Sequence, residues 1–482
     1  MTSLKKQAAS GVKWTALSTS ITTGLQFLKF AILARILGPE AFGLMGMVMV
    51  VIGFAQAFAD MGVSNAIIYR QDATKEQLSS LYWLNILSGI VVFFIIWAVT
   101  PLVVVFYKEP QLNSLLHWTA LIFLITPIGQ QFQILLQREL KFNWLSVIEV
   151  ITALADIIVA VLFAWRGSGV MALVLGQLAH AICRAVCLSM QGWRTWAPKF
   201  HFSLDDVKGY VGFGLYQMGE RTINYFNSNL DYLLIGRLLG AEPLGYYTLA
   251  YNLIIAPVVK INPIITRVAF PVFAKVQNDQ QLLKRGYLTV MRALSFVNFP
   301  IFFGLFATSS LLVHVVFGPK WLPSIILIKI LCGVGLLRST GNPVGSLLLA
   351  KGRADWGFMW NLMLMTTQVP GVLIGAHHGG VVGVAVAYLI LQMIYFILNY
   401  LILIRRLLGR CILEYLGSMW HSLKYSAIMG LGVLAVSKFL MNLAANLSLS
   451  MQIISGVVIY ALLWLLFRRK DIVEFKDLVF GK

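Results

Sequence analysis

The sequence predicts an all-α polytopic membrane protein with about fourteen membrane-spanning helices. Of its 482 residues, 59% are hydrophobic and only 12% are charged. Soluble domains carry roughly 25% charged residues, so a chain with so few charges cannot cover its surface with groups that bind water. Apolar segments of about 20 residues, long enough to cross a bilayer as a helix, recur along the whole chain. Lipid must therefore cover much of the folded surface.

The expected membrane helices follow one another with short connections. The fourteen predicted spans are residues 12–36, 42–67, 82–106, 115–136, 146–165, 169–190, 210–237, 245–269, 290–315, 323–349, 357–376, 380–404, 422–441 and 450–467. The first apolar run is too long for a signal peptide, so it is expected to remain as a helix. The connections leave no room for a separate soluble domain.

The positive charges indicate how the helices are oriented. With the N-terminus in the cytoplasm, the inner segments hold 26 of the 38 Lys and Arg residues, the outer ends hold six, and six lie within spans. Positively charged loops stay on the cytoplasmic side of a membrane, so both termini are expected there. This topology explains the net charge of +19, and no nucleic-acid partner is expected.

A short internal repeat divides the chain. Residues 34–43 read ARILGPEAFG and residues 236–245 read GRLLGAEPLG, an offset of 202 residues. Six predicted spans separate the copies, so both have the same orientation, as in transporters built from parallel repeats. The repeat predicts a six-helix lobe at 1–204, another at 205–408, and two extra helices with a cytoplasmic tail at 409–482. The alternative is a recurring turn motif without common ancestry.

Polar residues form stripes on several predicted membrane helices. The seventh span carries Glu220, Asn224, Asn227 and Asp231 on one helical face. At the repeat offset, Ser18, Thr22, Gln26 and Lys29 of the first span correspond to Glu220, Asn224, Ser228 and Asp231. Further stripes are Glu149 with Asp156, and Gln177 with His180 and Arg184. Such residues avoid lipid because a charge at the bilayer centre costs roughly 2.5–3.5 kcal/mol. They are expected to line a water-filled central cavity, or else to form hydrogen bonds between the helices of one lobe.

Five basic residues within the spans are the predicted substrate-binding groups. They are Lys29, Arg221, Lys260, Lys329 and Arg338. Together they would make the cavity cationic, and a cationic cavity attracts an anionic group such as phosphate. The alternative is structural ion pairing with the acids Asp60, Glu149, Asp156, Glu220 and Asp231.

Acidic residues in the same cavity are the candidates for ion coupling. Glu220 and Asp156 are the first choices for carrying H⁺ or Na⁺. No other cofactor is expected. The four cysteines form no CxxC pair, so neither a metal site nor a redox site is predicted.

Sequence signatures of common enzymes are absent from the chain. It contains no HExxH, GxxxxGK[ST] or GxSxG motif and no GxGxxG after a strand. A membrane glycosyl polymerase or ligase would need a large outer loop for its acceptor sugar, and no connection is long enough. The sequence therefore indicates a transporter rather than an enzyme.

Several stretches together resemble a known family. They are LARILGPEAFGL, FADMGVSNAIIYRQD, LYWLN, KINPIITRVAFPVFAKVQND and GLLRSTGNPVGSLLLAKGRAD. In these stretches the chain is similar to the polysaccharide flippases of the multidrug, oligosaccharidyl-lipid and polysaccharide exporter superfamily, and most of all to the colanic acid exporter branch.

The resemblance implies both a fold and a function. The implied fold is two six-helix lobes in a V around a central cavity, with two extra helices. The implied function is alternating-access transfer of undecaprenyl-diphosphate-linked oligosaccharide repeat units across the bacterial cytoplasmic membrane, from the inner to the outer leaflet. The implied partners are that lipid-linked substrate, membrane lipids, and the polymerase and chain-length machinery of polysaccharide assembly.

The main alternative within the superfamily is a multidrug/cation antiporter. Those proteins usually have twelve spans and a more acidic or apolar site. The fourteen predicted spans and the basic residues within them favour the flippase. The sequence does not indicate which sugar is carried.

Overall fold

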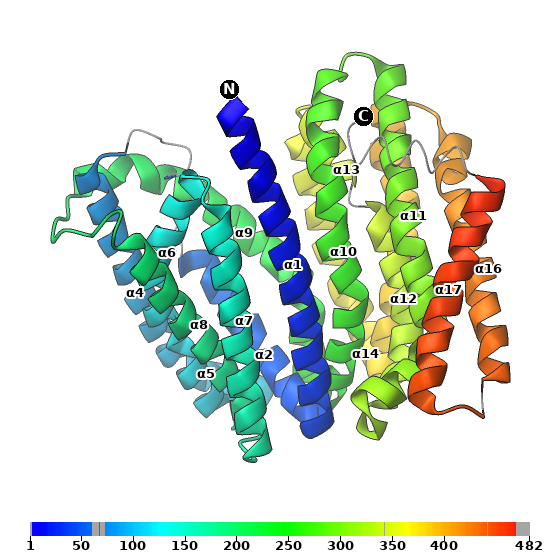
Figure 1. Ribbon diagram of the computed structural model, residues 1–482, viewed down its shortest axis with the longest axis horizontal. Coiled ribbons are helices and arrows are strands. Elements are labelled where there is room, and N and C mark those ends of the chain that lie inside the picture. The colour runs from blue at the N-terminus through cyan, green and yellow to red at the C-terminus, as the bar shows by residue number, and fades with distance from the viewer. Residues whose placement is uncertain (1, 60–66, 68–72, 342, 441, 469–482) are drawn as a thin grey trace. The chain divides into compact units, whose positions relative to one another are not determined.

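A computed structural model describes residues 2–59, 67, 73–341, 343–440 and 442–468. Every regular element in these residues is a helix, which confirms the all-α class (Figure 1). Apolar segments become helices in a membrane because a helix satisfies its backbone hydrogen bonds internally. The chain divides into two compact units, the first unit at Met1–Gly245 and the second unit at Tyr246–Lys482.

The first unit contains the helices from α1 to α9. Their bounds are α1 Thr2–Ile36, α2 Pro39–Ala59, α4 Lys75–Tyr107, α5 Leu112–Ala120, α6 Ile122–Arg138, α7 Phe142–Trp165, α8 Met171–Gly192 and α9 Leu204–Leu239. α1 packs along α7, and both α6 and α7 pack against α8. These four helices carry most of the polar stripes expected in this part of the sequence.

The second unit contains the remaining helices, with α10 beginning just before it. Their bounds are α10 Ala241–Lys275, α11 Gln280–Leu312, η1 Val313–Phe317, η2 Pro319–Trp321, α12 Ser324–Gly341, α13 Pro343–Ala350, α14 Ala354–Leu398, η3 Asn399–Ile404, α15 Arg405–Leu408, α16 Ile412–Phe439 and α17 Ala445–Phe467. α11 packs against α12 and α16, and α16 packs against α17.

Eleven helical stretches in the described residues are long and apolar enough to cross a membrane. One of them, Asp355–Leu408, covers the two spans expected at 357–376 and 380–404. The backbone of α14 is non-helical at Gly379 and Gly380, and this break separates the two spans. Gly380 has a φ of 55°, which favours glycine. Two other expected spans form the helices α9 and α16, which are not among the eleven. The multi-pass class is confirmed, and the count of fourteen stays a prediction.

The two copies of the internal repeat meet at two glycines. A Cβ atom on Gly43 would lie 1.7 Å from the carbonyl oxygen of Ala241. A Cβ atom on Gly245 would lie 1.9 Å from the carbonyl oxygen of Pro39. Each contact is the other shifted by the repeat offset of 202 residues, so the two helix starts touch reciprocally. Only glycine permits this approach, which explains why both copies end in that residue.

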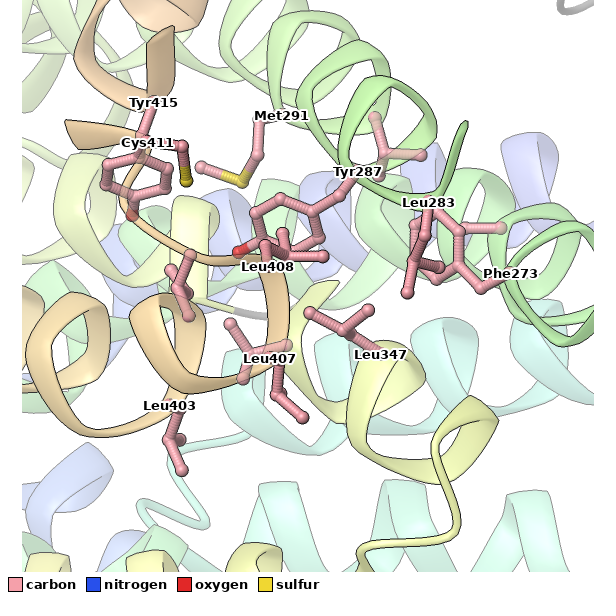
Figure 2. Packing of buried hydrophobic residues seen from close by; sticks show 14 of the residues in the cluster. Phe273, Leu283, Tyr287, Met291, Leu347, Leu403, Leu407, Leu408, Cys411 and Tyr415 are labelled. Atoms are coloured by element: carbon pink, nitrogen blue, oxygen red, sulfur yellow. The ribbon is translucent and has the colours of Figure 1, made fainter. Parts of the chain in front are cut away.

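A buried apolar cluster in the second unit joins segments that are far apart in the chain. It includes Phe273, Leu283, Tyr287, Met291, Leu347, Leu403, Leu407, Leu408, Cys411 and Tyr415 (Figure 2). These side chains come from α10, α11, α13, the turns after α14, and the start of α16. The cluster fixes the connection between α14 and α16 against the other helices of its unit.

Candidate functional site

The first unit contains a polar chamber among its membrane-spanning helices. The cavity measures about 540 Å³ and is bounded by α1, α2, α6, α7 and α8. Its polar lining consists of Gln26, Gln56, Thr126, Gln130, Gln133, Asp156, Gln177, His180 and Arg184. Polar groups at membrane depth face protein or water, because exposure to hydrocarbon costs several kcal/mol. The chamber therefore accommodates water or a polar ligand.

An ion pair between α1 and α7 lies at the wall of this chamber. Lys29 Nζ is 2.6 Å from Asp156 Oδ1, and the two side chains are 16% and 17% exposed. Nearer the start of both helices, Ser18 Oγ donates to Glu149 Oε2 at 3.1 Å. The sequence left open whether Lys29 faces a ligand or pairs with an acid. In this structure it pairs with an acid that was itself predicted to couple ions.

Close packing of α7 on α8 places the Asp156 carboxylate beside the chamber. A Cβ atom on Gly176 would lie 2.6 Å from Asp156 Oδ1 and 2.7 Å from Ala160 Cβ. Small residues of this kind let membrane helices approach each other. Gly176 thus leaves the space that the carboxylate occupies.

α8 also supplies a basic group to the chamber. Arg184 Nη2 donates to Gln133 Oε1 of α6 at 2.9 Å. The guanidinium is thereby tied to a neutral amide rather than to a carboxylate. The stripe that the sequence indicated on α8, which also includes Gln177 and His180, does face the chamber.

In the second unit, two tyrosines hold the guanidinium of Arg338. Arg338 Nη1 donates to Tyr251 Oη of α10 at 2.8 Å and to Tyr388 Oη of α14 at 2.9 Å. The two tyrosines are only 8% and 6% exposed. Phenol hydroxyls are uncharged, so these bonds orient the guanidinium without cancelling its charge. An oriented guanidinium has the planar fork that binds phosphate well.

Buried amides fix the helices on either side of Arg338. Asn262 Nδ2 of α10 donates to the Ser339 carbonyl of α12 at 3.0 Å. Asn298 Nδ2 of α11 donates to Asn262 Oδ1 at 2.9 Å. All three residues are fully buried. Hydrogen bonds of this kind join membrane helices, so three helices form a framework that presents Arg338.

The structure separates the other two basic residues of the second unit from Arg338. Lys260 is exposed, and it lies nine residues after Tyr251 on α10, which is two and a half turns. It therefore points away from the side of α10 that contacts Arg338. Lys329 lines a different cavity of about 430 Å³, bounded by α11, α12, α16 and α17. Among the described side chains, neither lysine pairs with a carboxylate.

The predicted polar stripes on α1 and α9 are only partly described. Thr22 Oγ1 donates to the Ser18 carbonyl within α1, and Gln26 lines the chamber. Asp231 is 1% exposed and accepts from the Tyr232 backbone at 3.0 Å. The side chains outside the described residues are those of Asp60, Glu220, Arg221, Asn224 and Asn227. Roles in binding or coupling stay predictions for all of these residues.

Sequence patterns did not identify several of the groups that the structure brings together. These are Gln56, Gln130 and Gln133 in the chamber, and Tyr251 and Tyr388 around Arg338. Gln130 and Gln133 are three residues apart on one helix face, so a search for shorter polar stripes would have found them. The two tyrosines carried no such signal, since isolated tyrosines are common in membrane helices.

A family model and related sequences match most of the chain. The model described as "Polysaccharide biosynthesis protein" matches residues 32–326. The lipopolysaccharide biosynthesis protein WzxC of Escherichia coli (strain K12) is 38% identical over 418 residues, which cover 87% of this chain and 85% of that protein. The teichuronic acid biosynthesis protein TuaB of Bacillus subtilis (strain 168) is 36% identical over 474 residues, which cover 96% of each.

A solved structure has a similar fold. The lipid II flippase MurJ in an inward closed conformation superposes with a TM-score of 0.75, over 95% of this chain and 99% of that one. The sequences are only 14% identical in this alignment, so the likeness concerns the fold alone. It agrees with the multi-pass helical architecture described above.

Proposed function

Because the chain belongs to the polysaccharide biosynthesis protein family, we propose that it is a flippase for lipid-linked oligosaccharides. In this proposal it moves undecaprenyl-diphosphate-linked repeat units from the inner to the outer leaflet, for assembly of an exopolysaccharide, capsule or O-antigen-type polymer. The family that the sequence stretches resembled is confirmed. The names of the two relatives, in lipopolysaccharide and teichuronic acid biosynthesis, support the choice of substrate.

The polar chamber of the first unit is the observation that carries this proposal. A diphosphate and a hydrated sugar cannot cross hydrocarbon unaided, since each unsatisfied polar group costs several kcal/mol there. A cavity of about 540 Å³ lined by amides and charged groups inside a set of apolar helices offers such groups an alternative to water. The polyprenyl chain needs no such shelter and stays in lipid. No covalent bond changes in this step.

Arg338 is the residue that we assign first to the diphosphate. Its guanidinium is oriented by Tyr251 and Tyr388, and a bidentate guanidinium matches two phosphate oxygens. A role in binding the substrate stays a proposal for Lys29, Arg221, Lys260 and Lys329, with Lys260 and Lys329 acting apart from Arg338. The polar residues proposed to line the path are Thr22, Gln26, Asn224, Asn227 and Asp231.

Net transport against a concentration gradient needs a source of energy, and for this alternating-access transporter we assign it to H⁺ or Na⁺ binding at Asp156 or Glu220. The geometry supports Asp156, because its carboxylate is engaged by Lys29 at 2.6 Å. A proton or a cation on Asp156 would weaken that ion pair and free the ammonium group. Occupancy at this one residue would thereby change the charge that the chamber presents.

The topology that we propose places both termini in the cytoplasm, at the bacterial inner membrane. The 26-to-6 distribution of Lys and Arg between inner and outer segments supports it. The proposal also keeps the lobes at residues 1–204 and 205–408 and the extra helices at 409–482. Polymerase and chain-length proteins are proposed to receive the substrate after transfer.

The test of the proposed function is deletion of the gene in its host. Both the secreted polysaccharide and the polyprenyl-linked intermediates are then measured, with the intermediates assigned to a leaflet by their accessibility to an impermeant reagent. We expect the polymer to be lost and repeat units to accumulate on the inner leaflet.

Two other results would contradict the proposal. Unchanged polymer and intermediates would favour a multidrug/cation antiporter, and resistance to cationic dyes would be measured next. Altered polymer length with repeat units still reaching the outer leaflet would instead indicate a polymerase or ligase.

A further inference from the structure

The chamber of the first unit holds a basic group that is bonded to an uncharged partner. Arg184 lines the chamber from α8, and its Nη2 atom donates to Gln133 Oε1 of α6 at 2.9 Å. An amide carries no charge, so this bond fixes the guanidinium without forming an ion pair. Among the described residues, no carboxylate forms an ion pair with Arg184. The guanidinium therefore keeps its positive charge at the wall of the chamber.

The acids nearest to the chamber are engaged by other groups. Asp156 pairs with Lys29 at 2.6 Å, so these two charges cancel. The charge of Glu149 acts on Arg184 from beyond ion-pair distance, and its carboxylate accepts from Ser18 Oγ at 3.1 Å. Glu149 does not line the chamber. With the Lys29–Asp156 pair neutral, Arg184 gives the lining of the chamber a net positive charge.

Close packing of α6 on α8 positions this guanidinium. A Cβ atom on Gly129 of α6 would lie 2.9 Å from the Cα atom of Ala185 on α8. Gln133 follows Gly129 by four residues, about one helical turn, and Arg184 directly precedes Ala185. The interface that brings the two helices together therefore also sets the amide against the guanidinium.

A guanidinium held in this way suits an anion with several oxygen atoms. Its planar fork of N–H donors matches two phosphate oxygens, and its bond to Gln133 reduces the side-chain freedom that is lost on binding. A charge at membrane depth is costly, so an anion that enters the chamber also gains from balancing it. The chamber measures about 540 Å³, within the range of roughly 300–1,000 Å³ that is usual for small-molecule sites.

We propose that Arg184 binds phosphate oxygens of the lipid-linked substrate in the chamber of the first unit, with Gln133 as its positioning residue. This role rests on the proposed flippase function and adds a binding residue to it. The sequence pattern assigned anion binding in this unit to Lys29. The structure gives Lys29 to Asp156 and leaves the charge of Arg184 to a ligand.

The test measures binding of three probes to the purified full-length protein in nanodiscs of zwitterionic lipid. The first probe is undecaprenyl diphosphate, and the second is undecaprenol, which has the same chain without phosphate. The third is inorganic diphosphate, which has the anion without the chain. Comparison of the three separates recognition of the phosphate group from recognition of the lipid.

Three variants and one control are compared with the wild type. Arg184→Gln removes the charge, Arg184→Lys keeps the charge but loses the planar fork, and Gln133→Leu removes only the positioning amide. Arg166→Gln is the matched control, because this arginine is exposed at the end of α7 and does not line the chamber.

The wild type is expected to bind undecaprenyl diphosphate more tightly than undecaprenol. Arg184→Gln is expected to lower the affinity for undecaprenyl diphosphate about tenfold or more, the usual effect of losing hydrogen bonds from a charged group. Arg184→Lys and Gln133→Leu should each lose about fivefold. The affinity for undecaprenol should stay unchanged in every variant, and the control should bind all probes as the wild type does.

Contrary results separate this assignment from the proposed function. An Arg184→Gln variant with wild-type affinity for undecaprenyl diphosphate would overturn the role of Arg184 and leave the flippase function standing. An equal loss for undecaprenol would show that Arg184 only joins α8 to α6, and would overturn it as well. Dependence on Arg184 for inorganic diphosphate alone would exclude the lipid-linked ligand. Binding of neither lipid by the wild type, together with unchanged polymer on gene deletion, would overturn the proposed function itself.

Discussion

The two units handle a basic side chain at membrane depth in different ways. In the first unit Lys29 is 2.6 Å from the carboxylate of Asp156, so its charge is neutralised by a partner of opposite sign. In the second unit Arg338 is held at 2.8 and 2.9 Å by the hydroxyls of Tyr251 and Tyr388, which orient it but carry no charge. Basic side chains thus have two kinds of partner in one chain.

The difference shows how partner chemistry decides what a buried cation can do. A carboxylate lowers the cost of placing an ammonium group in the membrane, and it also makes the pair responsive to any proton or cation that binds the acid. A phenol hydroxyl carries no charge, so its hydrogen bond orients a guanidinium without forming an ion pair with it. We therefore assign ion response to the first arrangement and anion recognition to the second.

The largest effect is expected from reversing the charge at Arg338. Arg338→Glu is expected to abolish export of the polysaccharide, because a carboxylate would repel the diphosphate that the guanidinium attracts. The protein amount in the membrane should stay near the wild-type level, measured by immunoblotting of a tagged chain. Arg221→Glu is expected to behave in the same way. Lys320→Glu, at an exposed position in η2, is the control. Full export by both variants would exclude a cationic site for the diphosphate.

Removing one partner of the first unit's ion pair is expected to destabilise the protein. Asp156→Asn leaves Lys29 charged and without its carboxylate partner among the helices. Removing one partner of a buried ion pair lowers the free energy of unfolding by roughly 3–5 kcal/mol. Thermal unfolding of the purified protein measures this effect. The double variant Lys29→Met, Asp156→Leu should recover most of the stability and still fail to export. If the double variant exported normally, the pair would be structural only.

A smaller effect is expected from filling the space beside Asp156. Gly176→Ala places a Cβ atom 2.6 Å from the Asp156 carboxylate oxygen, so either α8 or the carboxylate has to move. Overpacking of this kind typically lowers the free energy of unfolding by about 1–3 kcal/mol. Gly417→Ala is the control, since nothing lies within 4 Å of its Cβ position. Equal melting temperatures for Gly176→Ala and the wild type would show that α7 and α8 are not closely packed there.

The smallest effect is expected from removing one phenol hydroxyl near Arg338. Tyr251→Phe or Tyr388→Phe deletes one hydrogen bond, worth about 1 kcal/mol, and keeps the aromatic ring. Export should fall a few-fold for each single variant and further for the double variant, measured as polymer secreted per cell. The free energy of unfolding of each single variant should fall by about the same amount. If the double variant exports as well as the wild type, the tyrosines do not position the guanidinium.

The sequence by itself determined the class of protein and much of its local structure. Apolar segment length and charge distribution depend only on the order of residues, so both are sufficient to place membrane helices along the chain. The repeat offset predicted that Gly43 and Gly245 are equivalent, and the reciprocal contacts of α2 and α10 agree with it. The family followed from short sequence stretches, and the matching family model confirmed it.

Only the tertiary structure decided which side chains meet. The sequence offered five acids as partners for Lys29, and the packing of α1 on α7 selected Asp156. It grouped Lys260 and Lys329 with Arg338, whereas helix rotation places Lys260 on the other side of α10 and Lys329 in a separate cavity. The physical reason is that rotation and pairing of membrane helices are set by the fit of side chains from distant segments. That fit is not encoded in the spacing of residues along any one helix.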